Sequence, residues 1–352
     1  MSQLKVAHVV HDLSVGGVEE AVRNYFDFPH AEVDLQVVTI DCGSNKKSIN
    51  DAVAVLSQHV GSVNNPISYF SSLRDILKYK PDVLVCSLWR SMIIGLFFKL
   101  FCKGKVVCCS QNEKYKNVVD KVLHSVALIL FDAIFVDSKK TMTTLVPEKF
   151  IGKCRVISFK TKSIVSQPGA LSYRFIFWGR LVPQKRIDRA LSFFAEVKLL
   201  MPNAELLLIG PEEGESSYSD YAKKLGLGRE VELVGEKTFP EILDLAKGCS
   251  FYLQLSDFEG MAMSVVEAME MGLVPVVTPV GEISSYVKNR MNGFIVDFDN
   301  KKSWHTVLSY IKELEHAEYL RMSNEAIKFW SDKPVYADSM DESLSYVANI
   351  HS

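Results

Sequence analysis

Residues 251–267 read FYLQLSDFEGMAMSVVE, and this stretch decides the fold. The apolar run 251–256 predicts a buried strand, a short turn follows, and the apolar spacing from about Ser264 predicts a helix. A buried strand that leads into a helix is half of a βαβ unit, which is typical of a parallel sheet. Glu259 ends the strand segment and Glu267 lies on the helix, so two carboxylates flank one helix N-terminus.

These two acids allow two interpretations. Free backbone N–H groups at a helix start attract phosphate, and carboxylates accept hydrogen bonds from sugar hydroxyls. The segment is therefore a candidate for holding both ends of a nucleotide-sugar. Alternatively, Ser264 and Glu267 fit the S-x-x-E capping box, in which Glu267 caps its own helix and Glu259 is an ordinary solvated loop acid.

The same alternation of strand and helix runs along the whole chain. Short apolar runs alternate with amphipathic stretches such as 187–201, 240–247 and 264–271, which predicts successive βαβ units. The expected strands are 5–10, 35–40, 83–87, 105–110, 133–136 and 155–157, then 174–178, 205–209, 231–234, 251–255, 274–277 and 293–296.

This pattern divides the chain into two α/β domains of similar size. We expect an N-terminal domain over residues 1–165 and a C-terminal domain over 172–330. The segment 161–171 contains Ser166, Pro168 and Gly169 and is typical of a linker. Residues 331–352 have a helical pattern with no strand after it, and we expect this helix to pack back across the junction.

Composition excludes several classes of protein. The 352 residues carry a net charge of −2, which argues against a dedicated nucleic-acid binder. The longest apolar runs are far shorter than the ~20 residues that span a bilayer. The seven cysteines form no C-x-x-C pair, and the first residues are no signal peptide, so we expect a reducing, cytoplasmic compartment.

A glycine pair follows the first expected strand, in the sequence HDLSVGGVE (residues 11–19). Gly16 and Gly17 allow the backbone to approach a ligand closely, and the helix from Val18 presents its N-terminus. The motif is not G-x-G-x-x-G, and no acid ends the second strand as in ribose binding. A tight strand-to-helix turn without a ligand explains the same residues.

A basic loop follows the first strand of the second domain, in the sequence FWGRLVPQKR (residues 177–186). Arg180 and Lys185 lie where α/β folds bind ligands, at the carboxyl end of the sheet. Arg offers a bidentate fork to phosphate, and Lys offers a point charge. A solvated basic loop is the alternative.

Taken in order, these motifs resemble the retaining glycosyltransferases of family 4, most densely between residues 175 and 297. The resemblance implies a GT-B fold, in which two Rossmann-like domains face each other across a cleft. It also implies a nucleoside diphosphate sugar held mainly by the C-terminal domain, a glycan or lipid-linked acceptor, and no metal or cofactor.

The resemblance also implies a role for each site residue. Arg180 and Lys185 would neutralise the donor diphosphate, Glu259 would contact hydroxyls of the transferred sugar, and Glu267 would bind the ribose. Further donor-binding residues would be Gly16, Gly17, Gly179, Gly260, Met261, Ala262, Met263 and Ser264.

The acceptor side departs from the family pattern. Many members carry a His near the end of the fourth N-terminal strand, where this chain has Gln111, which cannot act as a general acid or base. Glu113 or His11 could take that role. Two loops also depart: Ser158-Phe159-Lys160 stands where Asn-Gly is frequent, and Arg186 where Gly is frequent.

The N-terminal half is basic as well. Residues 1–165 carry a net charge of +6 and residues 166–352 a net charge of −8. Residues 90–121 contain seven Lys and Arg but only two acids, and the basic residues are interleaved with large apolar residues. This predicts a peripheral contact with an anionic membrane through 90–121, at the inner face of the cytoplasmic membrane. A core helix followed by a basic loop is the alternative.

Three functions remain to be compared. The first is a retaining glycosyltransferase, in the setting of surface polysaccharide synthesis where such relatives are common. The second is a catalytically impaired partner protein that binds the donor or a glycan, motivated by Gln111. The third is a nicotinamide-dependent oxidoreductase, which the missing G-x-G-x-x-G and ribose-binding acid disfavour.

Overall fold

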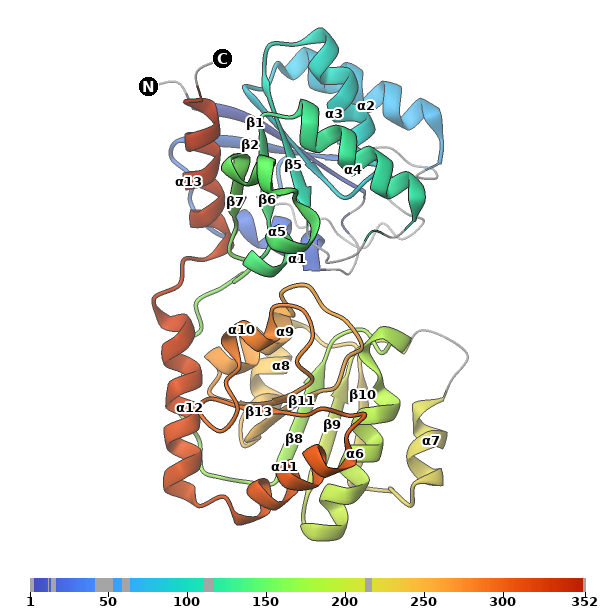
Figure 1. The fold of residues 1–352 in the computed structure, drawn as a ribbon, viewed down its shortest axis with the longest axis vertical. Coiled ribbons are helices and arrows are strands. Elements are labelled where there is room, and N and C mark those ends of the chain that lie inside the picture. The colour runs from blue at the N-terminus through green and yellow to red at the C-terminus, as the bar shows by residue number, and fades with distance from the viewer. Residues whose placement is uncertain are drawn as a thin grey trace. The chain divides into compact units, whose positions relative to one another are not determined.

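The computed structural model describes residues 3–11, 13, 17–41, 53–58, 64–110, 115, 117–212 and 217–350. The chain divides into two compact units, residues 1–162 together with 334–352, and residues 163–333. Each unit is built on one parallel β-sheet with helices on both faces (Figure 1). The predicted α/β class with two sheet-based domains is confirmed.

Within the described residues, the first sheet contains seven parallel strands in the order β3-β2-β1-β4-β5-β6-β7. Their bounds are β1 Leu4–Val10, β2 Val33–Thr39, β3 Val55–Gln58, β4 Val83–Ser87, β5 Lys105–Ser110, β6 Ala133–Val136 and β7 Cys154–Val156. Strands β4 and β6 are buried along their whole length, as expected for a parallel sheet covered on both faces. Strand β3 was not predicted, because its short sequence VLSQ has neither a long apolar run nor clear alternation.

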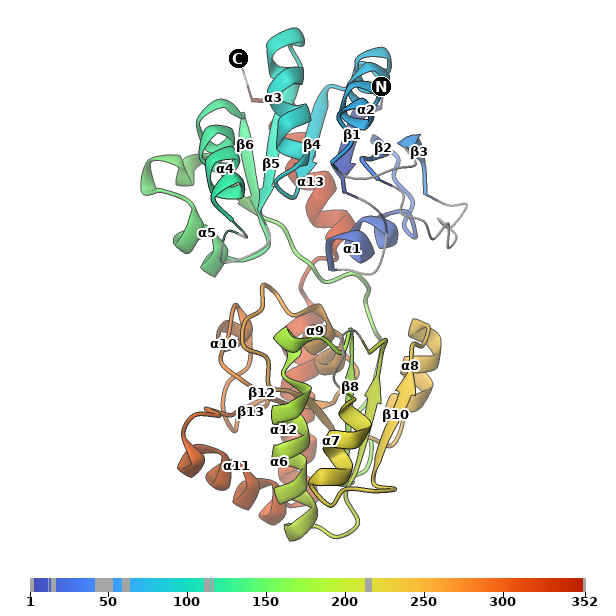
Figure 2. The same cartoon turned by 90° about the vertical axis from the view of Figure 1, so that its right-hand side faces the viewer.

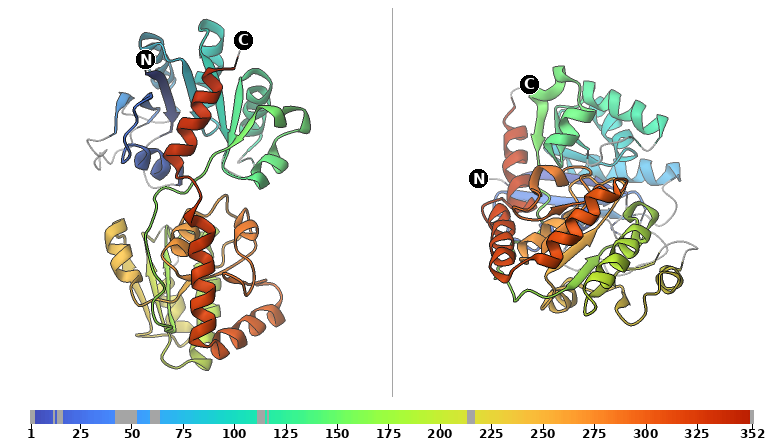
Figure 3. Two further views of the ribbon diagram at one scale, coloured as in Figure 1. Left: turned by 90° about the vertical axis from the view of Figure 1, so that its left-hand side faces the viewer. Right: turned by 60° about the horizontal axis from the view of Figure 1, so that its bottom comes forward.

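Two layers of helices cover this sheet. Helices α2 (Pro66–Tyr79), α3 (Ser91–Phe101) and α4 (Val118–Leu130) lie side by side on one face. Helices α1 (Gly17–Tyr25) and α13 (Tyr336–Ala348) pack together on the other face (Figure 3, left). The remaining elements are α5 (Lys139–Leu145) and a 3₁₀ turn over Glu148–Lys153.

The C-terminal helix α13 is a structural part of the first unit. Asp341 on α13 accepts hydrogen bonds from the Tyr25 hydroxyl and, at 2.7 Å, from His30 Nδ1. The backbone N–H of Tyr336 donates to the carbonyl of Lys160. The helix predicted over the last residues therefore covers a sheet whose strands come from the opposite end of the chain.

In the part of the second unit that the structure describes, the sheet contains six parallel strands in the order β10-β9-β8-β11-β12-β13. Their bounds are β8 Arg174–Trp178, β9 Glu205–Ile209, β10 Val231–Gly235, β11 Phe251–Gln254, β12 Val274–Val277 and β13 Phe294–Ile295. Helix α6 (Ile187–Leu200) contacts α7 (Tyr218–Lys224) and α11 (Lys301–Glu313) (Figure 2). Helix α9 (Met263–Glu270) packs against α12 (His316–Ser331). Helices α8 (Phe239–Ala246) and α10 (Ile283–Tyr286) also belong to this unit.

Both sheets reverse their strand order at one point, which positions the candidate sites. The reversal lies between β1 and β4 in the first sheet and between β8 and β11 in the second. In open parallel sheets, ligands bind beyond the carboxyl ends of the strands at such a reversal. The loops that follow β1, β4, β8 and β11 are therefore the places where function is expected.

Candidate functional site

The loop after β8 begins at a close approach between two backbone segments. Gly179 and Gly210, which follow β8 and β9, have φ angles of +137° and +139°. A Cβ atom on Gly210 would lie 1.9 Å from the carbonyl oxygen of Gly179, so no side chain fits there. Arg180 follows directly and is exposed, with its side chain at the carboxyl edge of the sheet.

Lys185 and Glu259 form an ion pair across the reversal point. Lys185 ends the 3₁₀ turn Pro183–Lys185 after β8, and its Nζ lies 2.8 Å from Glu259 Oε1 in the loop after β11. The two side chains are 17% and 6% exposed. Their sequence positions are 74 residues apart, so only the sheet order brings them together.

Three polar side chains, from β11 and the first turn of α9, form a hydrogen-bond network that ends at Glu259. Gln254 Nε2 donates to Glu259 Oε1 at 3.0 Å, and Gln254 Oε1 accepts from Ser264 Oγ at 3.0 Å and from the Tyr252 hydroxyl at 2.9 Å. Burial raises the pKa of Tyr252 well above its usual value, so the phenol stays a neutral donor. This network fixes one oxygen of Glu259. Its other oxygen, Oε2, accepts no hydrogen bond within the described part of the chain.

The capping-box interpretation of residues 264–267 is wrong. Helix α9 begins at Met263 rather than Ser264, and its N-cap is Ala262, which has a left-handed backbone with φ of 54°. The Ser264 hydroxyl bonds Gln254 instead of the helix backbone. Among the described residues, the N–H groups of Met263 and Ser264 have no acceptor, whereas that of Val265 donates to the Ala262 carbonyl. The start of α9 thus presents two N–H donors.

Glu267 points back to the end of β8. Its Oε2 accepts a hydrogen bond of 2.9 Å from Trp178 Nε1. Sequence reasoning missed Trp178, because a Trp inside an apolar run is normally a core residue. The indole N–H provided a signal, since a buried Trp usually needs an acceptor.

The loop after β12 holds the Glu259 loop from the other side. Gly281 has a φ angle of +58°, and a Cβ atom there would lie 2.3 Å from the Glu259 carbonyl oxygen. The N–H of Glu282 donates to the Gly260 carbonyl at 3.1 Å. The Tyr286 hydroxyl donates to the Met261 carbonyl at 2.7 Å. Residues 259–261 are therefore fixed from both neighbouring strands.

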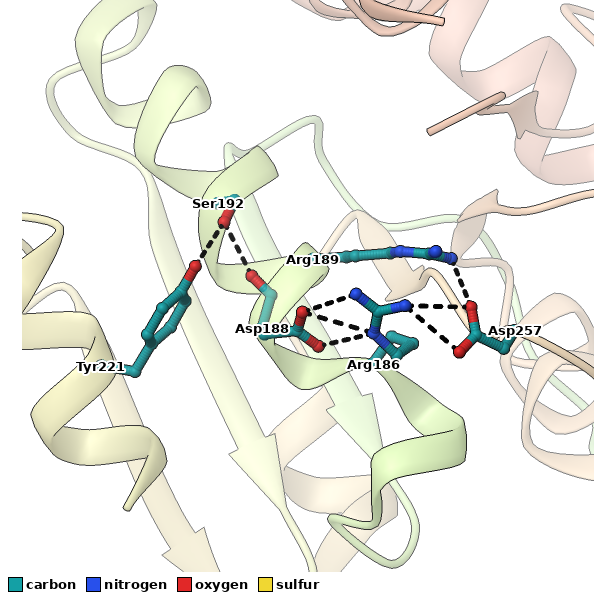
Figure 4. A network of polar contacts seen from close by, with 6 residues as sticks. All are labelled: Arg186, Asp188, Arg189, Ser192, Tyr221 and Asp257. Atoms are coloured by element: carbon teal, nitrogen blue, oxygen red, sulfur yellow. Dashed lines mark hydrogen bonds and ion pairs between the residues drawn. The ribbon is translucent and has the colours of Figure 1, made fainter. Parts of the chain in front are cut away.

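Arg186 ties the two loops of the site together (Figure 4). Its Nη1 lies 3.1 Å from Asp257 in the β11 loop, and its Nη2 lies 2.8 Å from Asp188. Arg189 also reaches Asp257, at 2.7 Å. Burial would raise the pKa of Asp188, but the hydrogen bond and charge of Arg186 outweigh it and hold this pKa below its usual range.

The backbone conformation of Arg186 explains why glycine is frequent at this position in the family that the sequence resembles. Its φ angle of 48° is in the left-handed region that favours glycine. The ion pairs of its side chain bind the residue in a conformation that a Cβ atom makes unfavourable.

The acceptor side of the prediction is described only in part. Gly16, Gln111 and Glu113 lie outside the described residues. Gly17 begins α1, and His11 follows β1, where its ring lies 6.5 Å from that of Trp89 in an edge-to-face arrangement. In the described part of the chain, no three His, Cys, Asp or Glu side chains cluster in a way that could hold a metal ion.

Comparison with known proteins shows what the second unit is similar to. Residues 165–329 match the family model described as glycosyl transferases group 1, and this match covers most of the second unit. The uncharacterized glycosyltransferase YqgM of Bacillus subtilis is 28% identical over 156 residues, which are 44% of this chain and 44% of that protein. The chain covers about half the length of the first curated relatives that it matches.

Two further proteins are similar to most of the chain. The UDP-Gal:alpha-D-GlcNAc-diphosphoundecaprenol alpha-1,3-galactosyltransferase of Escherichia coli is 22% identical over 349 residues, which cover 87% of each chain. HepE of Anabaena, in a crystal structure with UDP and glucose, has a TM-score of 0.77 at 15% identity, over 98% of this chain and 100% of that one. The fold is therefore GT-B, with two Rossmann-like α/β domains.

Proposed function

We propose that this protein is a retaining glycosyltransferase that moves a sugar from a nucleoside diphosphate sugar to a hydroxyl of a glycan or lipid-linked acceptor. The Lys185–Glu259 pair supports the proposal, because it puts a cation next to a carboxylate, a group that can accept hydrogen bonds from sugar hydroxyls, at the reversal point of the second sheet. Helix α9, which carries Glu267, begins directly after the Glu259 loop. The E. coli relative, by its name, transfers galactose to a lipid-diphosphate acceptor.

Each group has a distinct part in the proposed transfer. The bond between the anomeric carbon and the diphosphate oxygen breaks, and Arg180, Lys185 and the N–H groups of Met263 and Ser264 stabilise the charge that develops on the leaving diphosphate. Glu259 Oε2 accepts a hydrogen bond from a sugar hydroxyl. The acceptor oxygen attacks on the face that the diphosphate leaves, and its proton passes to that leaving group.

The protein side chains in this proposal take the electrostatic role of a metal. Arg180 and Lys185 are both cations, and Lys185 is positioned by a buried acid. We therefore propose that transfer proceeds without a divalent ion or other cofactor. Full turnover in excess chelator is the expected result, and a loss restored by one metal would contradict it.

The first unit supports a peripheral membrane contact through residues 90–121. Leu100 and Phe101 on α3 are 75% and 69% exposed, and Val118 on α4 is 77% exposed. Lys103 and Lys121 lie exposed among them. Within the described residues, no helix has both the length and the apolar content that a bilayer-spanning helix requires. An apolar face with cations suits an anionic lipid surface, as a lipid-linked acceptor of a surface polysaccharide requires.

A nucleotide-sugar screen tests the proposal first. Uridine, guanosine and adenosine diphosphate sugars are added separately, and thermal unfolding is followed. A selective upward shift identifies the donor by linkage, since a ligand that binds only the folded state stabilises it. No shift with any donor would contradict the proposed site.

Two substitutions then test the catalytic roles. Arg180→Ala and Lys185→Ala should each lower kcat/KM by about 10²-fold or more, the order seen when one charge-stabilising group is removed. Lys247→Ala is the matched control, because this lysine is a highly exposed cation of the same domain. Unchanged turnover in both site variants would rule out the donor site. Intact donor binding without transfer in the wild type would instead favour the non-catalytic partner protein that Gln111 suggests.

A further inference from the structure

Helices α2 and α3 enclose an apolar pocket that the donor site does not use. Its volume is about 390 Å³, within the range of small-ligand pockets. The lining includes Tyr69 and Phe70 from α2, and Ile93 and Phe97 from α3. Phe70 and Phe97 are 70% and 44% exposed, so both rings lie partly in solvent. An apolar slot with partly exposed aromatic rings favours an apolar ligand, because burial of these rings removes apolar surface from water.

The pocket begins at the carboxyl edge of the first sheet. Helix α3 follows β4, and β4 is the neighbour of β1 at the reversal point of this sheet. Trp89 lines the pocket at the start of α3, and its ring lies 6.5 Å from that of His11 after β1. The pocket is therefore next to the place where an open parallel sheet binds its ligand.

A cation lies at the same end of the pocket. The Arg90 guanidinium stacks over the Trp89 ring at 4.3 Å, and its Nη2 donates to Asn64 Oδ1 at 3.0 Å. Arg90 has no carboxylate partner in the described part of the chain. Residues 64–130 carry ten Lys and Arg and four acids. The apolar slot is thus joined to a cationic group, which complements an amphiphile with an anionic head.

We infer that this pocket binds the hydrocarbon chain of a lipid diphosphate acceptor, and that Arg90 binds the phosphate next to the chain. The inference rests on the proposed glycosyltransferase function, and it adds a subsite for the lipid part of the acceptor. The phosphate end then lies on the His11 side of the pocket. At its other end, α3 continues with the exposed residues Leu100 and Phe101, so a longer chain can follow an apolar surface.

A chain-length series on the wild-type protein gives the first test. Pyrophosphate, geranyl, farnesyl and geranylgeranyl diphosphate are titrated by calorimetry, without any sugar donor. Affinity should rise with each step until the pocket is filled, because each buried methylene group adds hydrophobic free energy. Equal affinity for pyrophosphate and farnesyl diphosphate would overturn the inference.

Two variants on one helix separate the pocket from the general apolar surface. Phe97→Ser should weaken farnesyl diphosphate binding about tenfold, an amount that the loss of a few methylene contacts produces. Leu100→Ser should leave it unchanged, because Leu100 is 75% exposed and does not line the pocket. An equal loss in both variants would show adsorption to an apolar surface and would contradict the pocket.

A charge variant and a competitor identify the ligand class. Arg90→Gln should weaken binding of farnesyl diphosphate and leave the weaker binding of farnesol unchanged. Phosphatidylglycerol vesicles should compete poorly; efficient displacement would show that bulk membrane lipid occupies the pocket and would overturn the acceptor assignment.

Failure of the subsite and failure of the proposed function give different results. Chain-dependent binding in a protein that transfers no sugar would contradict the enzyme and keep the pocket. Transfer to a lipid diphosphate acceptor with the same KM in Phe97→Ser and wild type would keep the enzyme and overturn the pocket.

Discussion

Breaking the Lys185–Glu259 pair tests the donor site by stability and by turnover together. Lys185→Met keeps most of the side-chain volume and removes the charge. Glu259, which is 6% exposed, then keeps one hydrogen bond from Gln254 Nε2 and loses its cation. Removing one partner of a buried ion pair costs about 3–5 kcal/mol in the free energy of unfolding. Because the lysine is partly exposed, we expect a loss of about 3 kcal/mol.

Substitution of the other partner, Glu259, should lower the free energy of unfolding by less. In Glu259→Gln, the amide oxygen still accepts from Gln254, and Lys185 at 17% exposure can turn toward water. We expect a loss of about 1 kcal/mol. In the double variant no buried charge is left without a partner. Its loss in free energy of unfolding should therefore be about 1–2 kcal/mol smaller than the sum of the two single losses.

The assay is urea unfolding followed by tryptophan fluorescence in a Trp89→Phe background. The other three tryptophans, Trp178, Trp304 and Trp330, all lie in the second unit, so the signal reports on the domain that carries the pair. Activity is measured in parallel, and both single variants should lose about 10²-fold in kcat/KM. Additive stability losses would show that the two side chains do not interact. A Lys185→Met enzyme within about tenfold of wild type would remove the lysine from the donor site.

Three further predictions concern other parts of the molecule. Burial lowers the pKa of His8 from 6.5 to about 4. Between these two pH values the unfolded chain binds a proton at His8 and the folded chain does not, so protonation favours unfolding. Stability should fall by about 3 kcal/mol as the pH drops through this window, and urea titrations of His8→Asn should lack that slope. Gly281→Ala should destabilise the second domain and abolish donor shifts in thermal unfolding, because of its φ of +58° and the contact with the backbone of residue 259. Gly152→Ala, with nothing within 4 Å, should do neither. Trp178→Phe removes the indole N–H that donates to Glu267, and it should raise the KM for the nucleotide-sugar about tenfold with kcat nearly unchanged. A tenfold fall in kcat instead would argue against a role in ground-state binding.

Local sequence patterns identified the elements and their order. Runs such as 83–87, 105–110, 174–178 and 274–277 became strands with the predicted bounds. Apart from their end residues these runs are apolar, because the interior of a parallel strand is buried on both faces. The loops that follow these strands are thereby identified as well, so Arg180, Lys185 and Glu259 could be selected without coordinates.

Partnerships between distant residues were beyond the sequence. The pairing of Lys185 with Glu259, and of Trp178 with Glu267, depends on β8 and β11 being neighbours, although β9 and β10 lie between them in the chain. The S-x-x-E pattern gave the wrong partner for Ser264, because local spacing carries no information about Gln254 on the adjoining strand.

The sequence alone therefore determined an α/β chain with two sheet-based domains and the loops that carry its polar groups. Tertiary structure alone decided which of those groups meet, why Arg186 can occupy a left-handed backbone position, and where the C-terminal helix packs. The two kinds of information differ in the distance along the chain over which they act. Apolar periodicity is set by each element's own burial, whereas ion pairs, hydrogen bonds and pockets form only after the order of strands has placed distant segments side by side.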